Sequence, residues 1–188
     1  MLKRAIIVVV LLALGGVAAA QNPRFTVFAG YSYGNTTYAS SQRSDLHGWE
    51  ASLEGFRFRP GLTLVVEGSA QAGWNQFPIS CVTVPVCTPA VPDARAKQYT
   101  LLGGPQISSL HGNFRPFAHV LAGASRVNVA TTGFFDSSTA WAAGAGGGVD
   151  YRWRGPFSWR VQADYLRMNL FGTHQNMIRA STGIVVRF

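Results

Sequence analysis

In several largely apolar segments, polar residues recur at every second position. Seven charged side chains occupy such positions, together with small polar residues. Within a segment they are separated by even numbers of residues, so an extended chain places them on one face. Four acids and three bases nearly balance, and unpaired charges in a dry interior are costly. The pattern predicts a cross-strand ion-pair network or, alternatively, a path for protons or ions. The seven are Glu50, Glu54, Glu67, Arg160, Asp164, Arg179 and Arg187.

The histidines do not fit a hydrolytic site, which needs a nucleophile beside a base and an acid behind it. The glycine-rich stretch 144–148 lacks the Lys-Ser/Thr and the helix of a phosphate loop, so small residues that relieve crowding explain it better. We therefore predict no enzyme, no cofactor and no metal site. The residues two positions after His47, His111, His119 and His174 are Trp49, Asn113, Leu121 and Asn176.

Two cysteines, Cys81 and Cys87, lie in a proline-rich segment without strand-like alternation. In an oxidising compartment they should form a disulfide that closes a small loop. The loop-entropy estimate for such a bond is about 2.4 kcal/mol. Two further ligands for a metal are not evident nearby, so we predict a disulfide that staples the loop.

The segments that carry these side chains are short, and apolar and polar residues alternate along them. The last eleven residues, 178–188, place apolar or neutral residues on one face and both arginines on the other, and they end on Phe188. Strict period two over about ten residues is the pattern of a membrane-spanning β-strand. Similar segments occur at 24–33, 47–57, 62–72, 97–108, 114–127, 139–151 and 157–167. They predict an all-β, eight-stranded antiparallel up-and-down transmembrane β-barrel.

The links between these segments alternate in length. Short links are expected after the second, fourth and sixth segments, and longer ones at 34–46, 73–96, 128–138 and 168–175. Outer-membrane barrels have short turns on one side and longer loops on the other. An interior of eight strands is just wide enough for side chains to fill, which favours a structural ion-pair network over conduction.

Composition and the N-terminus agree with this class. Residues 1–20 have a basic start, an apolar run and an Ala-Ala-Ala end, which predicts a cleaved signal peptide and leaves 21–188 as the barrel domain. The chain is 47% hydrophobic but only 13% charged, below the usual quarter of a soluble domain. Its net charge of +8 is scattered rather than gathered with aromatics, so nucleic-acid binding is not expected.

One face collects large apolar residues and the other collects the charges. We expect the charges inside and the aromatics in lipid; a soluble barrel that binds a small apolar ligand would reverse the two faces. His119 is placed in the lumen because a titratable group in lipid is expensive. Strict alternation would put Phe56 and Phe58 on the polar face. A bulge at Gly55, or the end of the strand at the headgroup level, would explain this exception. The apolar face holds Trp49, Leu53, Leu64, Tyr99, Trp141, Trp159, Tyr165 and Ile184.

Five segments resemble the single-domain eight-stranded outer-membrane barrels grouped with the OmpA transmembrane domain and OmpX in a porin-like superfamily. The resemblance implies a monomer in the bacterial outer membrane, surrounded by membrane lipids and lipopolysaccharide. It also implies that Phe188 is the assembly signal read by the barrel-insertion machinery. The segments are HGWEASLEG (47–55), RPFAHVLAG (115–123), AGAGGGVDYRW (143–153), VQADYLR (161–167) and ASTGIVVRF (180–188).

The expected function is a structural or surface-interaction role, with the links at 34–46 and 73–96 as external contacts to an unknown adhesion partner. A small porin-like channel is the alternative within the membrane class.

Overall fold

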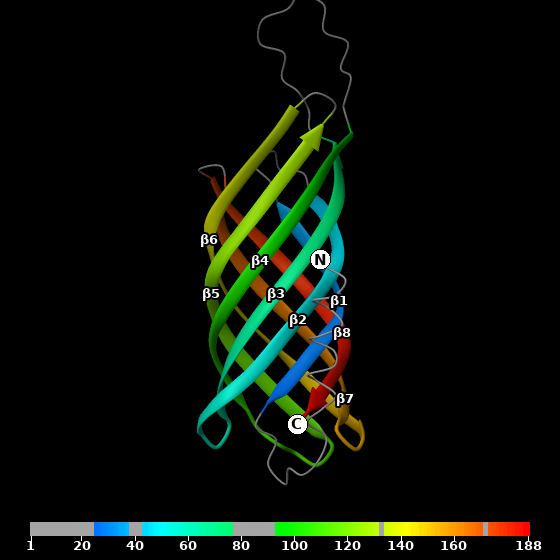
Figure 1. Ribbon diagram of the computed structural model, residues 1–188, viewed down its shortest axis with the longest axis vertical. Coiled ribbons are helices and arrows are strands. Elements are labelled where there is room, and N and C mark those ends of the chain that lie inside the picture. The colour runs from blue at the N-terminus through cyan, green and yellow to red at the C-terminus, as the bar shows by residue number, and fades with distance from the viewer. Residues whose placement is uncertain (1–24, 38–42, 77–92, 132–133, 171–172) are drawn as a thin grey trace, which may run out of the picture.

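The computed structural model describes residues 25–37, 43–76, 93–131, 134–170 and 173–188. They form one closed barrel in which each antiparallel strand pairs with the next and β8 pairs with β1 (Figure 1). The fold predicted from the alternation is confirmed. No helix in this described part of the chain is long and apolar enough to cross a membrane. The strands are β1 (Thr26–Thr37), β2 (Arg43–Arg59), β3 (Leu62–Gln76), β4 (Asp93–Ser108), β5 (Phe114–Thr131), β6 (Phe134–Arg154), β7 (Phe157–Leu170) and β8 (Thr173–Arg187).

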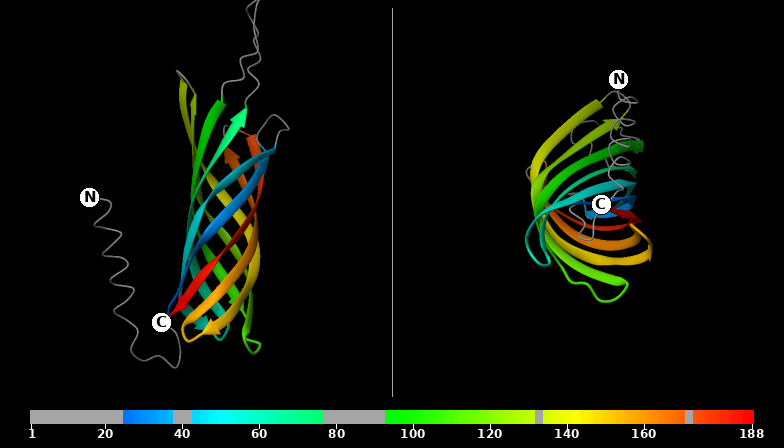
Figure 2. Two further views of the ribbon diagram at one scale, coloured as in Figure 1. Left: turned by 90° about the vertical axis from the view of Figure 1, so that its right-hand side faces the viewer. Right: turned by 60° about the horizontal axis from the view of Figure 1, so that its bottom comes forward.

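Three turns join β2 to β3, β4 to β5 and β6 to β7 at one end of the barrel (Figure 2). Gly61 and Gly155 adopt φ values of 85° and 58° there, a conformation that glycine reaches without a steric penalty. The backbone N–H of Phe188 donates to the Phe25 carbonyl at 3.0 Å, so both ends of the described chain meet at the same end. We call this end the turn side and the opposite end the loop side.

The strands reach further towards the loop side than the sequence predicted. Residues 132 and 133 alone separate β5 from β6, and residues 171 and 172 alone separate β7 from β8. The predicted long links at 128–138 and 168–175 are therefore wrong, and those at 34–46 and 73–96 shorten to 38–42 and 77–92. The reason is that paired strands continue their hydrogen-bond ladder past the apolar belt. Figure 1 shows β5 and β6 rising together in this way.

An irregularity near the end of β2 contains the two phenylalanines that did not fit the alternation. The register between β2 and β3 shifts between Gly55 and Arg59, and Phe56 has a φ of 48°. Residues 56–58 of β2 stand opposite the single residue Thr63 of β3 in this irregular stretch, and Phe56 and Phe58 are both on the outside, with 75% and 64% of their surface exposed. The predicted bulge is confirmed, at the residues that follow Gly55.

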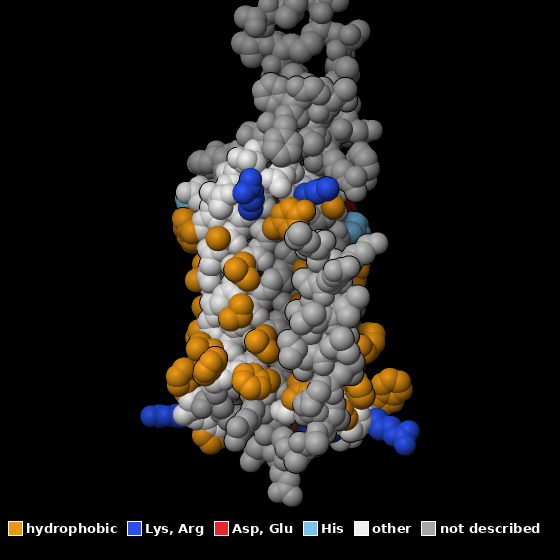
Figure 3. All heavy atoms as spheres, viewed as in Figure 1, with side chains coloured by type: hydrophobic (Ala, Val, Ile, Leu, Met, Phe, Trp, Pro, Cys, Tyr) orange, Lys and Arg blue, Asp and Glu red, His pale blue; other side chains and the backbone are white. Residues whose placement is uncertain are grey.

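The outer surface carries the apolar residues. Orange apolar side chains are scattered over the visible wall in Figure 3 and are densest towards the turn side. All eight members of the predicted lipid face are exposed; Trp49, for example, is 58% exposed. The soluble barrel with this apolar face turned inward is therefore wrong, because all eight of its residues lie on the outside.

The predicted signal peptide, 1–20, and the predicted Cys81–Cys87 disulfide lie outside the described residues.

The inside of the barrel is not polar throughout. Leu166 and Met168 follow Asp164 along β7, and Met177 precedes Arg179 along β8, so these apolar residues lie on the loop side of the charges. Gln98 donates from Nε2 to the Met168 sulfur at 3.3 Å within this layer. The alternation predicted a charged lumen and gave no sign of this layer. Its buried members are Leu46, Leu121, Val127, Ala142, Leu166, Met168 and Met177; Val65 and Leu102, which belong to the same apolar cluster, lie beside the charges, because Val65 pairs with Glu54 and Leu102 with Glu67.

Candidate functional site

The structure places all seven predicted lumen charges inside the barrel. Six are at most 3% exposed, and the side chain of Arg187 is 10% exposed. They join His119 and two residues that the sequence analysis left out of the network, Arg115 and Asp150. The turn-side cluster is Glu54, Arg115, Asp150, Arg160 and Arg187. The middle cluster is Glu50, Glu67, His119, Asp164 and Arg179.

In the turn-side cluster, guanidinium groups outnumber carboxylates. Arg160 donates from Nε to Asp150 Oδ1 at 2.6 Å and from Nη2 to Glu54 Oε1 at 2.5 Å. Arg115 donates to the other Glu54 oxygen at 2.9 Å, and Arg187 donates to Asp150 Oδ2 at 2.7 Å. Each carboxylate is thus shared between arginines from different strands.

Two aromatic rings support the central arginine of this cluster. The Arg160 guanidinium carbon lies 4.3 Å from the centroid of the Phe117 ring and 5.2 Å from that of Phe28. An arginine over an aromatic face is stabilised by the ring quadrupole, and more so away from water. These rings occupy lumen positions that the sequence analysis did not interpret.

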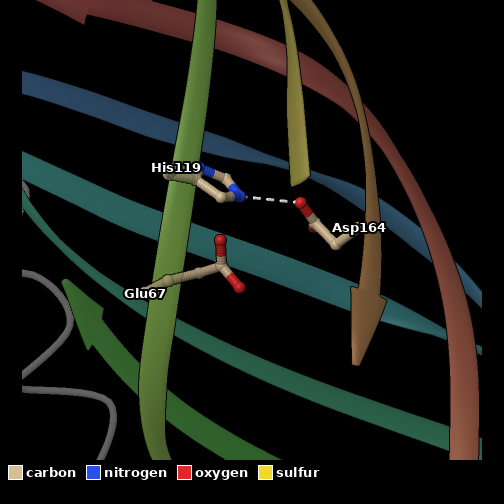
Figure 4. Close-up of side chains that lie close together, drawn as sticks. All are labelled: Glu67, His119 and Asp164. Carbon is tan, nitrogen blue, oxygen red and sulfur yellow. Dashed lines mark hydrogen bonds and ion pairs between the residues drawn. The ribbon is translucent and has the colours of Figure 1, made fainter. Parts of the chain in front are cut away.

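In the middle cluster, three carboxylates surround one guanidinium. Arg179 donates from Nη2 to Asp164 Oδ2 at 2.7 Å and to Glu67, and its Nε lies 3.2 Å from Glu50 Oε2. The His119 Nε2 lies 2.8 Å from the other Asp164 oxygen, Oδ1 (Figure 4). The residues come from β2, β3, β5, β7 and β8, so the cluster crosses the whole lumen.

Neutral donors complete the shell around Glu50. Gln162 donates to Glu50 Oε1 at 2.5 Å, and Ser181 donates to Glu50 Oε2 at 2.7 Å. Each oxygen of this buried carboxylate therefore accepts a hydrogen bond, which offsets part of the free energy lost on removing it from water.

Glycines in β6 make room for the middle cluster. Gly146 pairs with Asp164, and a Cβ on Gly146 would lie 1.9 Å from Asp164 Oδ1. The neighbouring Gly148 would place a Cβ 2.2 Å from the Val161 carbonyl oxygen. The missing side chains let Asp164 lie against the barrel wall, which agrees with the prediction that these glycines relieve crowding.

The sequence contained signals for the two missed residues. Asp150 stands on the polar phase of its segment, between Val149 and Tyr151, and this phase could have assigned it to the lumen. Arg115 begins a segment whose alternation is less regular, so its direction depended on the register of β5 with its neighbours.

The two clusters carry opposite surplus charge. The turn-side cluster has three arginines and two carboxylates, whereas the middle cluster has one arginine, three carboxylates and a histidine. The network can hold the barrel together through the lumen and can retain protons or a cation.

No protein-family model and no curated protein sequence matches the chain. Among solved structures, it is similar to Neisserial surface protein A, with a TM-score of 0.65 and 15% identity over 87% of this chain and 97% of that one. Ail, the attachment invasion locus protein of Yersinia pestis, gives a TM-score of 0.57 and 16% identity over 88% and 99% of the two chains. OprG, an outer-membrane protein of Pseudomonas aeruginosa, gives a TM-score of 0.55 and 10% identity over 87% of this chain and 95% of that one. The chain has the closed eight-stranded fold of the outer-membrane β-barrel proteins.

Proposed function

We propose that this chain is an integral protein of the bacterial outer membrane that acts as a structural and surface-interaction platform. The observation that carries the proposal is the distribution of side chains, with apolar and aromatic residues outside and ten ionisable residues inside a closed wall. A wall of this kind is stable in hydrocarbon because all of its strands are paired and its charges face one another. The predicted signal peptide would supply export, and lipids and lipopolysaccharide would surround the belt.

The filled lumen favours this role over a porin-like channel. The turn-side cluster, the middle cluster and the apolar layer follow one another along the barrel, and side chains such as Arg160, Arg179 and Leu121 are at most 1% exposed. We expect no steady conductance in planar lipid bilayers. Regular single-channel openings above a few tens of picosiemens would support the channel instead.

A binding role is also favoured over an enzymatic one. In the described part of the chain, the serine hydroxyl that contacts a histidine ring is that of Ser109, 3.3 Å from His111 Nδ1 in an exposed turn. No carboxylate of the described residues contacts His111, so this pair lacks the acid that would orient its base.

Surface contacts would be made on the loop side, where β1 to β8 extend past the belt. The names of the Neisserial surface protein and the Yersinia attachment invasion protein support a surface role of this kind. Trimming 77–92 should then weaken attachment to a host-cell or abiotic surface while the barrel stays folded. Unchanged attachment would remove this segment as the contact.

Membrane insertion is tested by cell fractionation and by electrophoresis of heated and unheated samples. The chain should sediment with the outer membrane and migrate differently before and after heating, because a closed barrel resists detergent until it is boiled. Recovery as a soluble periplasmic protein would contradict the proposal.

Two neighbouring positions test the orientation of the wall. Spin labels at Leu53→Cys, on the exposed face, and at Ser52→Cys, in the lumen, differ by one residue on β2. Collisions with dissolved oxygen, which concentrates in lipid, should be several-fold more frequent at position 53. More frequent collisions at position 52 would mean that the faces are reversed.

The proposed assembly signal is tested by removing Phe188. The loss of its backbone pairing with Phe25 should lower the free energy of unfolding in detergent by about 1 kcal/mol. The amount of folded protein in cells should fall far more, because the insertion machinery would no longer recognise the last strand. Equal assembly of the full and shortened chains in cells would contradict this role.

A further inference from the structure

Three side chains of the middle cluster have the donor atoms of a transition-metal site. Glu67 on β3, His119 on β5 and Asp164 on β7 each offer one ligand atom, and these atoms all lie within 4.8 Å of one another. Figure 4 shows the Glu67 carboxylate directed towards the His119–Asp164 pair. All three residues are buried, so their relative positions are set by the barrel wall.

Arg179 leaves the oxygens that face His119 available. It binds Asp164 through Oδ2, whereas His119 faces Oδ1. It binds Glu67 through Oε1. The arginine therefore orients both carboxylates from behind, as the outer partners of metal ligands commonly do.

The charge of the middle cluster favours a divalent cation. With a neutral His119 and all three carboxylates ionised, one guanidinium leaves a surplus of two negative charges in a part of the lumen that is buried. Uncompensated buried charge is strongly unfavourable. One divalent cation neutralises this surplus, and the additional arginine of the turn-side cluster is held by Glu54 and Asp150 instead.

We propose that Glu67, His119 and Asp164 bind one divalent transition-metal ion, with Zn²⁺ as the ion to test. One imidazole nitrogen with two carboxylate oxygens is a donor set that suits Zn²⁺ and its first-row neighbours, whereas Ca²⁺ and Mg²⁺ prefer oxygen alone. The cation would replace the proton between His119 Nε2 and Asp164 Oδ1, with a Glu67 carboxylate oxygen as the third ligand. It would tie three strands together across the lumen, independently of any surface partner.

The test uses the full chain with Cys81→Ser and Cys87→Ser, so that thiols cannot bind the metal. The protein is refolded in detergent micelles with excess Zn²⁺, passed over a chelating resin and assayed for zinc by atomic emission. We expect about one zinc per chain, as for a single site with three protein ligands. X-ray absorption at the zinc edge should show nitrogen and oxygen neighbours at about 2.0–2.2 Å, with the signature of one imidazole.

Matched histidine variants locate the site. His119→Gln should weaken zinc binding by more than about tenfold, since even the loss of an outer partner has an effect of that size. His47→Gln and His111→Gln, both at exposed positions, should keep it. Folding of each variant is checked by the difference in migration between heated and unheated samples.

Several outcomes would overturn the proposal. These are a refolded chain that retains no zinc, equal retention by folded His119→Gln, and an absorption spectrum without imidazole. The spectrum is recorded on the chain with an intact His119, so the proposal stays testable if His119→Gln does not fold. None of these outcomes bears on membrane insertion, which is measured separately by fractionation.

Discussion

The turn-side and middle clusters both pair arginines with carboxylates, but they differ in how their charge is compensated. In the turn-side cluster, Arg115 and Arg187 reach the barrel end and retain 10% side-chain exposure, so water can screen a surplus positive charge. In the middle cluster, Glu50, Asp164 and Arg179 are at most 3% exposed and a surplus negative charge has no solvent to screen it. Depth along the lumen therefore decides whether a mismatch of charges is tolerated or must be neutralised by protons or a cation.

The largest difference between the clusters should follow the loss of one arginine from each. Arg179→Ala leaves three buried carboxylates without their common partner and should lower the free energy of unfolding by about 3–5 kcal/mol. Arg187→Ala removes its hydrogen bonds to Asp150 and Ser158 beside solvent, while Asp150 keeps Arg160, and should lower the free energy of unfolding by about 1.5 kcal/mol. Urea titration in detergent micelles, followed by tryptophan fluorescence, measures both values. Equal losses would mean that depth along the lumen does not matter.

A smaller effect should come from crowding the middle cluster without removing a charge. In Gly146→Ala the new methyl group would overlap Asp164 Oδ1 and the Ala163 carbonyl oxygen, so the aspartate must move away from His119 and Arg179 and the adjoining backbone must shift. Overpacking of this kind should lower the free energy of unfolding by about 1–3 kcal/mol. Gly68→Ala is the matched control, because its Cβ would meet only Leu101 Cδ1, at 3.9 Å. A loss as large in the control would show that the effect arises from strand glycines in general.

The smallest effect should come from the aromatic support of the turn-side cluster. Phe117→Leu keeps an apolar side chain but removes the ring beneath Arg160, and should lower the free energy of unfolding by about 1 kcal/mol. Phe114→Leu, at an exposed position on the same strand, should change it less. The same urea titration compares the two variants. A larger loss for Phe114→Leu would mean that the ring does not stabilise Arg160.

Alternation predicted the strands, the outward direction of residues such as Trp49 and the inward direction of Glu50, because side chains on a strand change face at every residue. His119 was placed in the lumen from the cost of a titratable group in lipid. The ends of β5 to β8 were missed because ladder hydrogen bonds are formed by the backbone, and no side-chain pattern marks where they stop. The apolar layer around Leu121 and Met177 was missed because alternation distinguishes two faces but does not give the height of a residue along the barrel.

The sequence by itself determined the class of fold and the face on which each charge lies, since both follow from period two. Which charges meet was decided only by the tertiary structure. Asp164 lies beside Arg179 because β7 and β8 pair in one register, and Glu67 joins them from β3 because the closed wall brings it across the lumen. Register and closure depend on all eight strands at once, so the division into a turn-side and a middle cluster cannot be read from any single segment.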